Sequence, residues 1–364
     1  MIIRELALQQ FRCFNDRRFS FDGRVVIIQG PNGVGKSSLL EALHYCCYLR
    51  SFRTHLNREL VMLGHDLFFI TIACEQEQLG VTDQIQVGFS GAQGKVVKYN
   101  QKPVQSYREL LDFFKVVTLT ADDVLLVQGD PEGRRDFLNY ALLLGKPELS
   151  QTFKDFYHIL QQRNSLLAQR GRLDETFLIW TQKLWEATRH LREQRVVYLQ
   201  QLEQSVNAML EQYFASTPEA QMRVQFVYAP KNTNPDLAFD AFWDLYQSKY
   251  VSTEQEWGRS LFGIHLDDFS ILFQDKKARM FASRGQQKLL ALLIKIAQLQ
   301  QLSDKGEPGI LLLDDFMTDF DHTRVAQAFA ALEHLKYQMF ISCPVSPKAF
   351  LHGISSDNVC HIVL

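Results

Sequence analysis

The sequence predicts an α/β fold in which a lobe with a mixed sheet is interrupted by a largely helical second lobe. Two observations predict it. Strand-like and helix-like apolar patterns alternate in the N-terminal third of the chain and return after Gly263. Between them, from about residue 148 to 215, glycine is scarce and apolar residues recur at helical steps. We therefore expect 1–125 and 261–364 to form one α/β lobe, with 126–260 as the helical insertion.

The N-terminal segment predicts two strands before a glycine-rich turn. Ile3, Leu6, Leu8 and Phe11 alternate with polar residues, as in a strand that buries one face. Residues 25–28 form a short apolar run, which is typical of a buried strand, and lead directly into glycines. An apolar, helix-like run follows these glycines and suits a helix packed on a sheet.

The middle of the chain changes from strand-like to helical patterns. Residues 67–100 alternate and carry turn signals at three glycines, which indicates antiparallel strands flanking the sheet. Apolar residues from 184 to 213 recur at steps of three, four or seven and predict a long amphipathic helix. A helical stretch at 148–169 precedes it across residues 170–172, so the two can form an antiparallel hairpin, either an ordinary subdomain or a coiled coil. A strand is predicted at 224–228.

Composition bounds the class of protein. The 364 residues are 46% hydrophobic, which is ample for a continuous core. A net charge of -2 excludes a globally basic, histone-like binder, although a local basic face can still hold phosphates. The six cysteines contain no CxxC pair, which indicates reduced thiols and no zinc site. With neither a signal peptide nor a long apolar run, we expect a soluble, cytoplasmic protein without a membrane partner.

The glycine-rich turn fits the P-loop pattern GxxxxGKS between a strand and a helix. Its backbone N–H groups can close around phosphate oxygens at a helix N-terminus. Lys36 is expected to neutralise the β- and γ-phosphates, and the Ser37 hydroxyl to join the shell of a Mg²⁺ ion. An ordinary glycine turn is the alternative. The predicted ATP-binding residues are Gly30, Pro31, Asn32, Gly33, Val34, Gly35, Lys36, Ser37 and Ser38.

A second motif supplies two carboxylates. Residues 310–313 form an apolar run that ends in Asp314 and Asp315, as at the end of a buried strand facing a nucleotide. Asp314 is expected to support Mg²⁺ with Ser37, and Asp315 to orient or deprotonate the attacking water. A solvated strand-to-loop junction is the alternative. The predicted catalytic residues are thus Lys36, Asp314 and Asp315.

A third motif lies between these two in the sequence. Residues 283–287, SRGQQ, precede a helix-like run and resemble the SxGQ signature of ABC ATPases. The resemblance implies that Ser283, Arg284, Gly285 and Gln286 contact, from one subunit, the γ-phosphate held by the P-loop of another. A helix cap is the alternative. The lobe is therefore expected to be an ABC-type P-loop ATPase, in which ATP joins two copies of the chain.

The chain also resembles the RecF family over nearly its whole length. The similar segments are 8–12 (LQQFR), 48–54 (YLRSFRT), 122–138 (DDVLLVQGDPEGRRDFL), 281–283 (FAS) and 318–321 (TDFD). The resemblance implies a cytoplasmic, slow Mg²⁺-dependent ATPase that dimerises with ATP and acts in DNA replication, DNA repair and the SOS response. It also implies binding to gapped or junction DNA with RecR, and assistance in loading RecA on single strands.

Several positions depart from the RecF pattern. Ile264 and Leu266 stand where a proline and a basic residue are expected, which puts any role of that basic residue in doubt. Ala121 replaces a proline, and Asn139 an aspartate. Residues 342–344, SCP, contain no switch histidine, in contrast to transporter ABC domains. This fits slow hydrolysis used for switching.

The DNA-contacting residues are less well marked. Arg50, Arg53 and Arg58 could form a basic edge near the nucleotide. Three further arginines lie at helical spacing in the insertion, either as phosphate contacts or as a solvated helix face: Arg189, Arg192 and Arg195. A non-repair ABC ATPase subunit and an ATP-binding scaffold remain the alternative functions.

Overall fold

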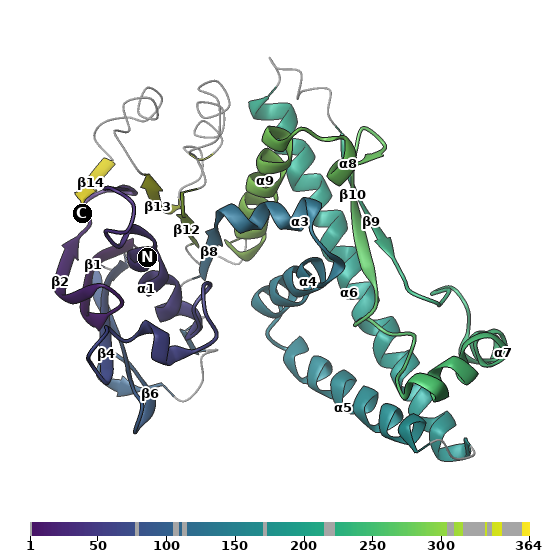
Figure 1. Ribbon diagram of the computed structural model, residues 1–364. Coiled ribbons are helices and arrows are strands. Elements are labelled where there is room, and N and C mark those ends of the chain that lie inside the picture. Colours follow the sequence, from purple (N-terminus) through teal and green to yellow (C-terminus); the bar gives the residue numbers. More distant parts are fainter. Residues whose placement is uncertain are drawn as a thin grey trace. The chain divides into compact units, whose positions relative to one another are not determined.

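The computed structural model describes residues 2–76, 80–104, 109–110, 115–169, 173–214, 223–303, 309–315, 332, 337–343 and 359–364. They belong to two compact units (Figure 1). The first comprises Met1–Asp123, Glu211–Ala215 and Lys288–Leu364, and the second comprises Val124–Leu210 and Ser216–Gln287.

An antiparallel sheet forms one part of the first unit. Its strands, in order across the sheet, are β2 (Phe14–Ser20), β1 (Ile2–Phe11), β4 (Leu67–Gln76), β5 (Val81–Ser90), β6 (Gly94–Tyr99) and β7 (Lys102–Pro103). Burial alternates along β4 and β5, because side chains of a strand point in turn to opposite faces. Leu8 pairs with Ile70 in the register that sends both to the core. The predictions of an opening strand and of antiparallel strands at 67–100 are confirmed.

A parallel sheet forms the other part of the first unit. Its strands, in order, are β14 (Val359–Val363), β3 (Val25–Gln29), β13 (Gln338–Cys343), β12 (Gly309–Leu313) and β8 (Lys115–Leu119). Every residue of β8, β12 and β13 is buried, as expected for parallel strands covered on both faces. The α/β fold class is confirmed, with the two strand directions divided between two sheets.

Helix α1 (Lys36–Tyr48) packs against strands of both sheets of the first unit. All but one of its 13 residues are buried, which explains why apolar residues are not confined to one face of the helix. Among the described residues, the other helical segments that lie wholly or partly in this unit are η1 (Asn57–Leu60), η2 (Ala121–Val124), α9 (Arg284–Ser303) and the last residues of α6 (Glu175–Tyr213).

The second unit is mainly helical. Its helices are α3 (Leu125–Gln128), α4 (Pro131–Gly145), α5 (Leu149–Ala168), α6 (Glu175–Tyr213), α7 (Phe239–Trp257) and α8 (Ala278–Phe281). The predicted helices at 148–169 and 184–213 are confirmed as α5 and α6, while the link at 170–172 lies outside the described residues. Within the described part of the chain, no helix is long and apolar enough to cross a membrane.

The second unit also contains a small antiparallel sheet. Its strands, in order, are β11 (Lys276–Lys277), β10 (Asp268–Phe273) and β9 (Val224–Ala229). Pairing of β10 with β9 groups residues 261–287 with the helical unit, whereas the sequence pattern had placed the boundary at 261. All four tryptophans of the chain also belong to this unit: Trp180, Trp185, Trp243 and Trp257.

Buried ion pairs hold the helices of the second unit together. Arg163 on α5 pairs with Glu254 on α7, and both side chains are completely buried. Arg192 on α6 pairs with Asp267 at 2.6 Å, and Arg195 donates to the carbonyl oxygen of Ile264 at 2.8 Å. Because Arg192 and Arg195 are buried, both interpretations of these two residues from sequence, phosphate contact and solvated helix face, are wrong.

Candidate functional site

The glycine-rich turn between β3 and α1 has the backbone that its glycines predict. Gly33 has φ +89° and Gly35 has φ +111°, values that side-chain-bearing residues rarely adopt. A Cβ atom on Gly35 would lie 2.6 Å from the Phe14 ring and 2.7 Å from the Cys13 sulfur. Both conformation and space therefore require glycine at position 35.

Lys36 begins α1 and turns back into the loop. Its side chain is buried, and its Nζ donates to the carbonyl oxygens of Gly30 at 3.0 Å and Pro31 at 3.1 Å. The ammonium group thus lies within the curve of the glycine-rich backbone. This geometry concentrates positive charge where a phosphate would be surrounded by N–H groups.

The two predicted motifs meet at the carboxyl end of the parallel sheet. Ser37 at the start of α1 donates from its Oγ to Oδ1 of Asp314, which follows β12, over 2.9 Å. The backbone N–H of Asp314 donates to the carbonyl oxygen of Leu119 at the end of β8. Burial raises the pKa of Asp314 above its ordinary value, while hydrogen bonds from Ser342 and Ser37 act in the opposite direction.

Asp315 is the next residue and has an unusual backbone. Its φ of +46° lies in the left-handed region, which is uncommon for a residue with a side chain. Its backbone N–H donates to Ser342 Oγ at 2.8 Å. The structure thus brings Lys36, Ser37, Asp314 and Asp315 into one site.

A cavity of about 550 Å³ opens at this site. Its lining includes P-loop residues, Asp315 and side chains from the β1–β2 turn and from the segment after α1. The lining residues are Arg12, Cys13, Asn32, Gly33, Gly35, Lys36, Ser37, Ser38, Arg53, Glu59, Val61 and Asp315. The oxygens of Ser37 and Asp314 are the donors that fit Mg²⁺. Among the described residues, no cluster of three or more His, Cys, Asp or Glu side chains could hold a metal by itself.

Sequence reasoning missed the residues that organise one side of this cavity. Glu41 on α1 is fully buried and accepts hydrogen bonds from Arg12 Nε and Nη2, both at 2.8 Å. It also accepts a hydrogen bond from the Ser51 hydroxyl, and its Oε2 lies 3.9 Å from Arg53. A single acid within an otherwise apolar helix was the signal in the sequence, because a buried carboxylate requires partners.

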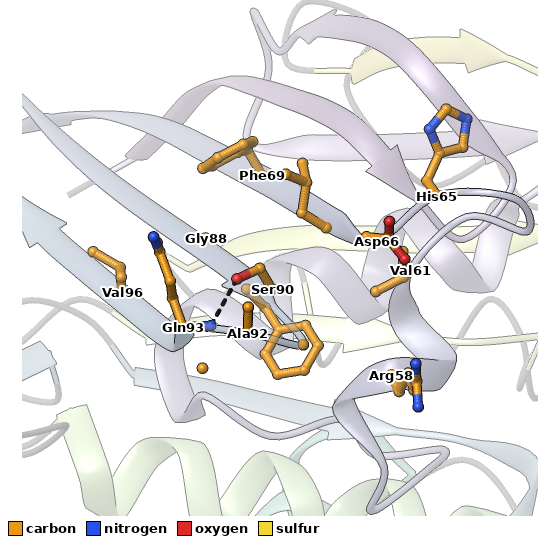
Figure 2. A pocket seen from close by; sticks show the side chains of 14 residues that line it. Arg58, Val61, His65, Asp66, Phe69, Gly88, Ser90, Ala92, Gln93 and Val96 are labelled. Carbon is orange, nitrogen blue, oxygen red and sulfur yellow. Dashed lines mark hydrogen bonds between the residues drawn. The ribbon is translucent and has the colours of Figure 1, made fainter.

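The three arginines predicted as a DNA-binding edge differ in their surroundings. Arg53 lines the 550 Å³ cavity, and Arg50 is exposed. Arg58 lines a separate cavity of about 520 Å³ on the antiparallel sheet, together with Phe69 and Val96 (Figure 2). A common role in DNA binding stays a prediction for these residues.

The signature segment forms the start of α9. The Ser283 N–H donates to Gln286 Oε1 at 2.8 Å, and the Gln286 N–H donates to Ser283 Oγ at 3.3 Å. These reciprocal bonds form a capping box. Ser283 and Arg284 are exposed, while Gln287 is buried and donates to carbonyl oxygens of the preceding turn. The cap interpretation is therefore correct within one chain, and contact with a second chain stays a prediction.

The RecF-like passages in the second unit form internal contacts. Arg134 pairs with both carboxylate oxygens of Asp268 at 2.8 Å. Asn139, one of the departures, accepts a hydrogen bond from Arg195 at 2.6 Å. These residues hold α4 and α6 to the segment that contains Ile264 and Leu266. The predicted segment 318–321 lies outside the described residues.

Comparisons with known proteins give one consistent result. The family model described as RecF/RecN/SMC N terminal domain matches residues 2–350. A DNA replication and repair protein RecF from Cyanothece sp. strain PCC 7425 is 30% identical, with 94% of this chain and 91% of that protein covered. The corresponding RecF protein of Geobacter metallireducens is 27% identical over 100% of this chain and 98% of its own length.

Solved structures show the same fold. A structure described as the recombination mediator protein RecF-ATPrS in the RecFOR pathway has a TM-score of 0.80 at 24% identity, covering 98% of this chain and 96% of its own. An Smc head domain from Pyrococcus furiosus has a TM-score of 0.56 at 13% identity, covering 97% of this chain and 91% of its own. The likeness of the chain to both structures extends along almost its entire length.

Proposed function

The chain belongs to the RecF proteins of the RecF/RecN/SMC N-terminal domain family, and we propose that it is an ATPase that acts in DNA replication and repair. In this proposal, ATP binding and hydrolysis control whether the protein binds DNA or releases it. One observation carries the proposal. The hydrogen bond between Ser37 and Asp314 joins the P-loop to the strand end that carries two carboxylates, beside a cavity that Lys36 and Asp315 also line. This arrangement supports phosphoryl transfer to water.

Different residues of the site have different roles in the proposed ATP hydrolysis. N–H groups of residues 30–38 and the ammonium of Lys36 bind the phosphates, and in doing so Lys36 exchanges its carbonyl partners for phosphate oxygens. Ser37 and Asp314 would hold Mg²⁺, which supplies charge neutralisation at the phosphates. Asp315 orients the attacking water and accepts its proton.

The exposed cap of α9 supports a role for a second copy of the chain. Ser283 and Gly285 lie at the N-terminus of a long helix, where N–H groups and the helix dipole favour an anion. In this proposal they contact, together with Arg284 and Gln286, the γ-phosphate bound by the partner copy. ATP then holds the homodimer together, and hydrolysis releases it.

The substrate and partners follow from the relatives. The RecF relatives are described as DNA replication and repair proteins, and the similar structure as part of the RecFOR pathway. We therefore propose sequence-independent binding to gapped or junction DNA in the cytoplasm, cooperation with RecR and help in loading RecA. Arg50, Arg53 and Arg58 are the proposed phosphate contacts, which makes binding weaker as salt rises.

The proposal is tested by ATPase activity titrated with duplex, single-stranded and gapped DNA. Slow basal turnover that DNA stimulates is expected, and Lys36→Ala should abolish nucleotide binding. Turnover that no DNA form changes would contradict the DNA switch. ATP binding without any turnover would instead indicate an ATP-binding scaffold.

Dimerisation is tested separately by light scattering. ATP with Mg²⁺ should convert the wild-type monomer to a dimer, and Ser283→Arg should stay monomeric while still binding ATP. Asp315→Asn should slow hydrolysis and accumulate the ATP-bound dimer. A wild-type protein that stays monomeric at saturating ATP would overturn the shared site, and unchanged turnover in Asp315→Asn would remove that residue from catalysis.

A further inference from the structure

We propose that Ser342 is a positioning residue that fixes the two carboxylates of Asp314 and Asp315 for ATP hydrolysis. The inference rests on the proposed ATPase function and assigns a task to the strand end that lacks a switch histidine. Ser342 lies in β13, directly beside β12, and its side chain is buried, with 1% of its surface exposed. It is therefore fixed in the sheet rather than carried on a loop.

One hydroxyl connects both acids. Ser342 Oγ accepts the backbone N–H of Asp315 at 2.8 Å and lies 2.9 Å from Asp314 Oδ1 and 3.3 Å from Asp315 Oδ1. A serine hydroxyl has a single proton to donate. The shorter distance assigns that proton to Asp314, so that Ser342 and Ser37 both donate to the same carboxylate oxygen.

This arrangement fixes Asp314 from two sides. Ser37 approaches from the start of α1, and Ser342 approaches from the neighbouring strand. Hydrogen bonds to a charged carboxylate are stronger than those between neutral groups. With two donors on one oxygen, the carboxylate is held beside Ser37, the residue with which it would hold Mg²⁺.

The same hydroxyl holds Asp315 in its unusual conformation. A left-handed backbone is unfavourable for a residue with a side chain, and it persists only where neighbouring groups enforce it. The bond from the Asp315 N–H to Ser342 is such a constraint. Without it, Asp315 can relax to an extended backbone, and its carboxylate leaves the cavity that it lines.

The first test is steady-state ATP hydrolysis by Ser342→Ala and Ser342→Thr. Loss of a hydrogen bond that orients a metal-binding residue typically lowers metal affinity or activity by about 10–100-fold. We expect Ser342→Ala to lower kcat by about that factor with KM for ATP within about threefold of wild type, and Ser342→Thr, which keeps the hydroxyl, to recover most of kcat. Ser342→Cys keeps the volume but donates weakly, and should resemble Ser342→Ala.

A matched control separates positioning from general stability. Ser260 has an equally buried hydroxyl, which bonds to Arg163 and Asn164 in the second unit. Ser260→Ala should therefore leave kcat unchanged. Hydrogen exchange in the nucleotide-free protein gives a readout independent of turnover: the Asp315 N–H should exchange about tenfold faster in Ser342→Ala than in wild type.

The outcomes distinguish this inference from the function on which it rests. Wild-type protein without turnover overturns the proposed ATPase and the inference together. Active wild type with an equally active Ser342→Ala variant overturns only the inference. Equal losses of kcat in the alanine and threonine variants, or Asp315 exchange that does not change, would also overturn it, since the hydroxyl then does not position the acids.

Discussion

The ion pair between Arg163 and Glu254 is expected to stabilise the helical unit, and substitution of Arg163 tests this. Both side chains are completely buried, and Arg163 donates to the two carboxylate oxygens at 2.9 and 2.6 Å. Arg163→Met keeps an unbranched chain of comparable length but removes the charge and every hydrogen bond. Glu254 then remains as a buried carboxylate without a cation, which is strongly unfavourable in an apolar interior.

The size of the effect follows from the other contacts of Glu254. Breaking a buried ion pair by removing one partner costs about 3–5 kcal/mol. Here the Tyr246 hydroxyl and the Leu261 N–H continue to donate to the same carboxylate, at 2.6 and 2.7 Å. We therefore expect the free energy of unfolding to fall by about 3 kcal/mol, near the lower limit of that range. Adding Glu254→Gln removes the unpaired charge and should restore part of the loss.

Urea unfolding followed by tryptophan fluorescence measures this change, because all four tryptophans lie in the second unit. The matched control is Glu193→Gln, which breaks an exposed pair with Arg189 in which the side chains are 52% and 61% exposed. An exposed pair on one helix contributes about 0.5 kcal/mol or less. A loss in Arg163→Met no larger than that in the control would refute the argument from burial.

Three further changes concern the first unit. Glu41→Gln removes a carboxylate that accepts two hydrogen bonds from Arg12, and should cost about 2–3 kcal/mol, measured by urea unfolding and circular dichroism. Burial and nearby cations lower the pKa of His44 from 6.5 to about 3. The unfolded chain protonates His44 below pH 6.5 while the folded chain does not, so the free energy of unfolding falls by about 1.4 kcal/mol per pH unit between pH 6.5 and 3. Urea unfolding of His44→Gln should therefore depend less on acid pH than that of wild type. Gly35→Ala should abolish binding of a fluorescent ATP analogue, because φ is +111° and a Cβ would meet an aromatic ring at 2.6 Å, whereas Gly91→Ala, with open space, should bind normally.

Local patterns in the sequence predicted much of the fold. The strand at 25–28, the helix after it and the long helix α6 follow from apolar spacing, which depends only on neighbouring residues. The contacts of Arg192 and Arg195 could not be predicted in this way. Their partners Asp267 and Ile264 lie about seventy residues away in sequence, and a charged residue on a helix looks the same whether it faces water or a buried carboxylate.

The candidate site also combines features that local sequence patterns predict with contacts between distant residues that they do not. The P-loop pattern and the acidic strand end are contiguous motifs that can be read directly from the sequence, and the structure brings Ser37 and Asp314 together. Arg12 and Glu41 were missed because their pairing depends on packing of α1 against the N-terminal sheet. In the sequence, Ser342 is notable only because the segment around it contains no switch histidine. A serine in a strand gives no indication of a role until its hydrogen-bond partners are known.

The packing of α1 against both sheets also has a consequence for folding cooperativity. In the proposed function, phosphate groups bound at Lys36 and Ser37 would interact with the first turn of α1, a helix that packs against both the antiparallel and the parallel sheet. Neither core can open fully while that helix stays in place. Ligand at one hundred times its Kd stabilises the folded state by about 2.7 kcal/mol. Because α1 packs against both sheets, nucleotide binding should stabilise both of them. The two sheets should therefore unfold in one cooperative transition, and the midpoint temperature of that transition should rise with nucleotide concentration.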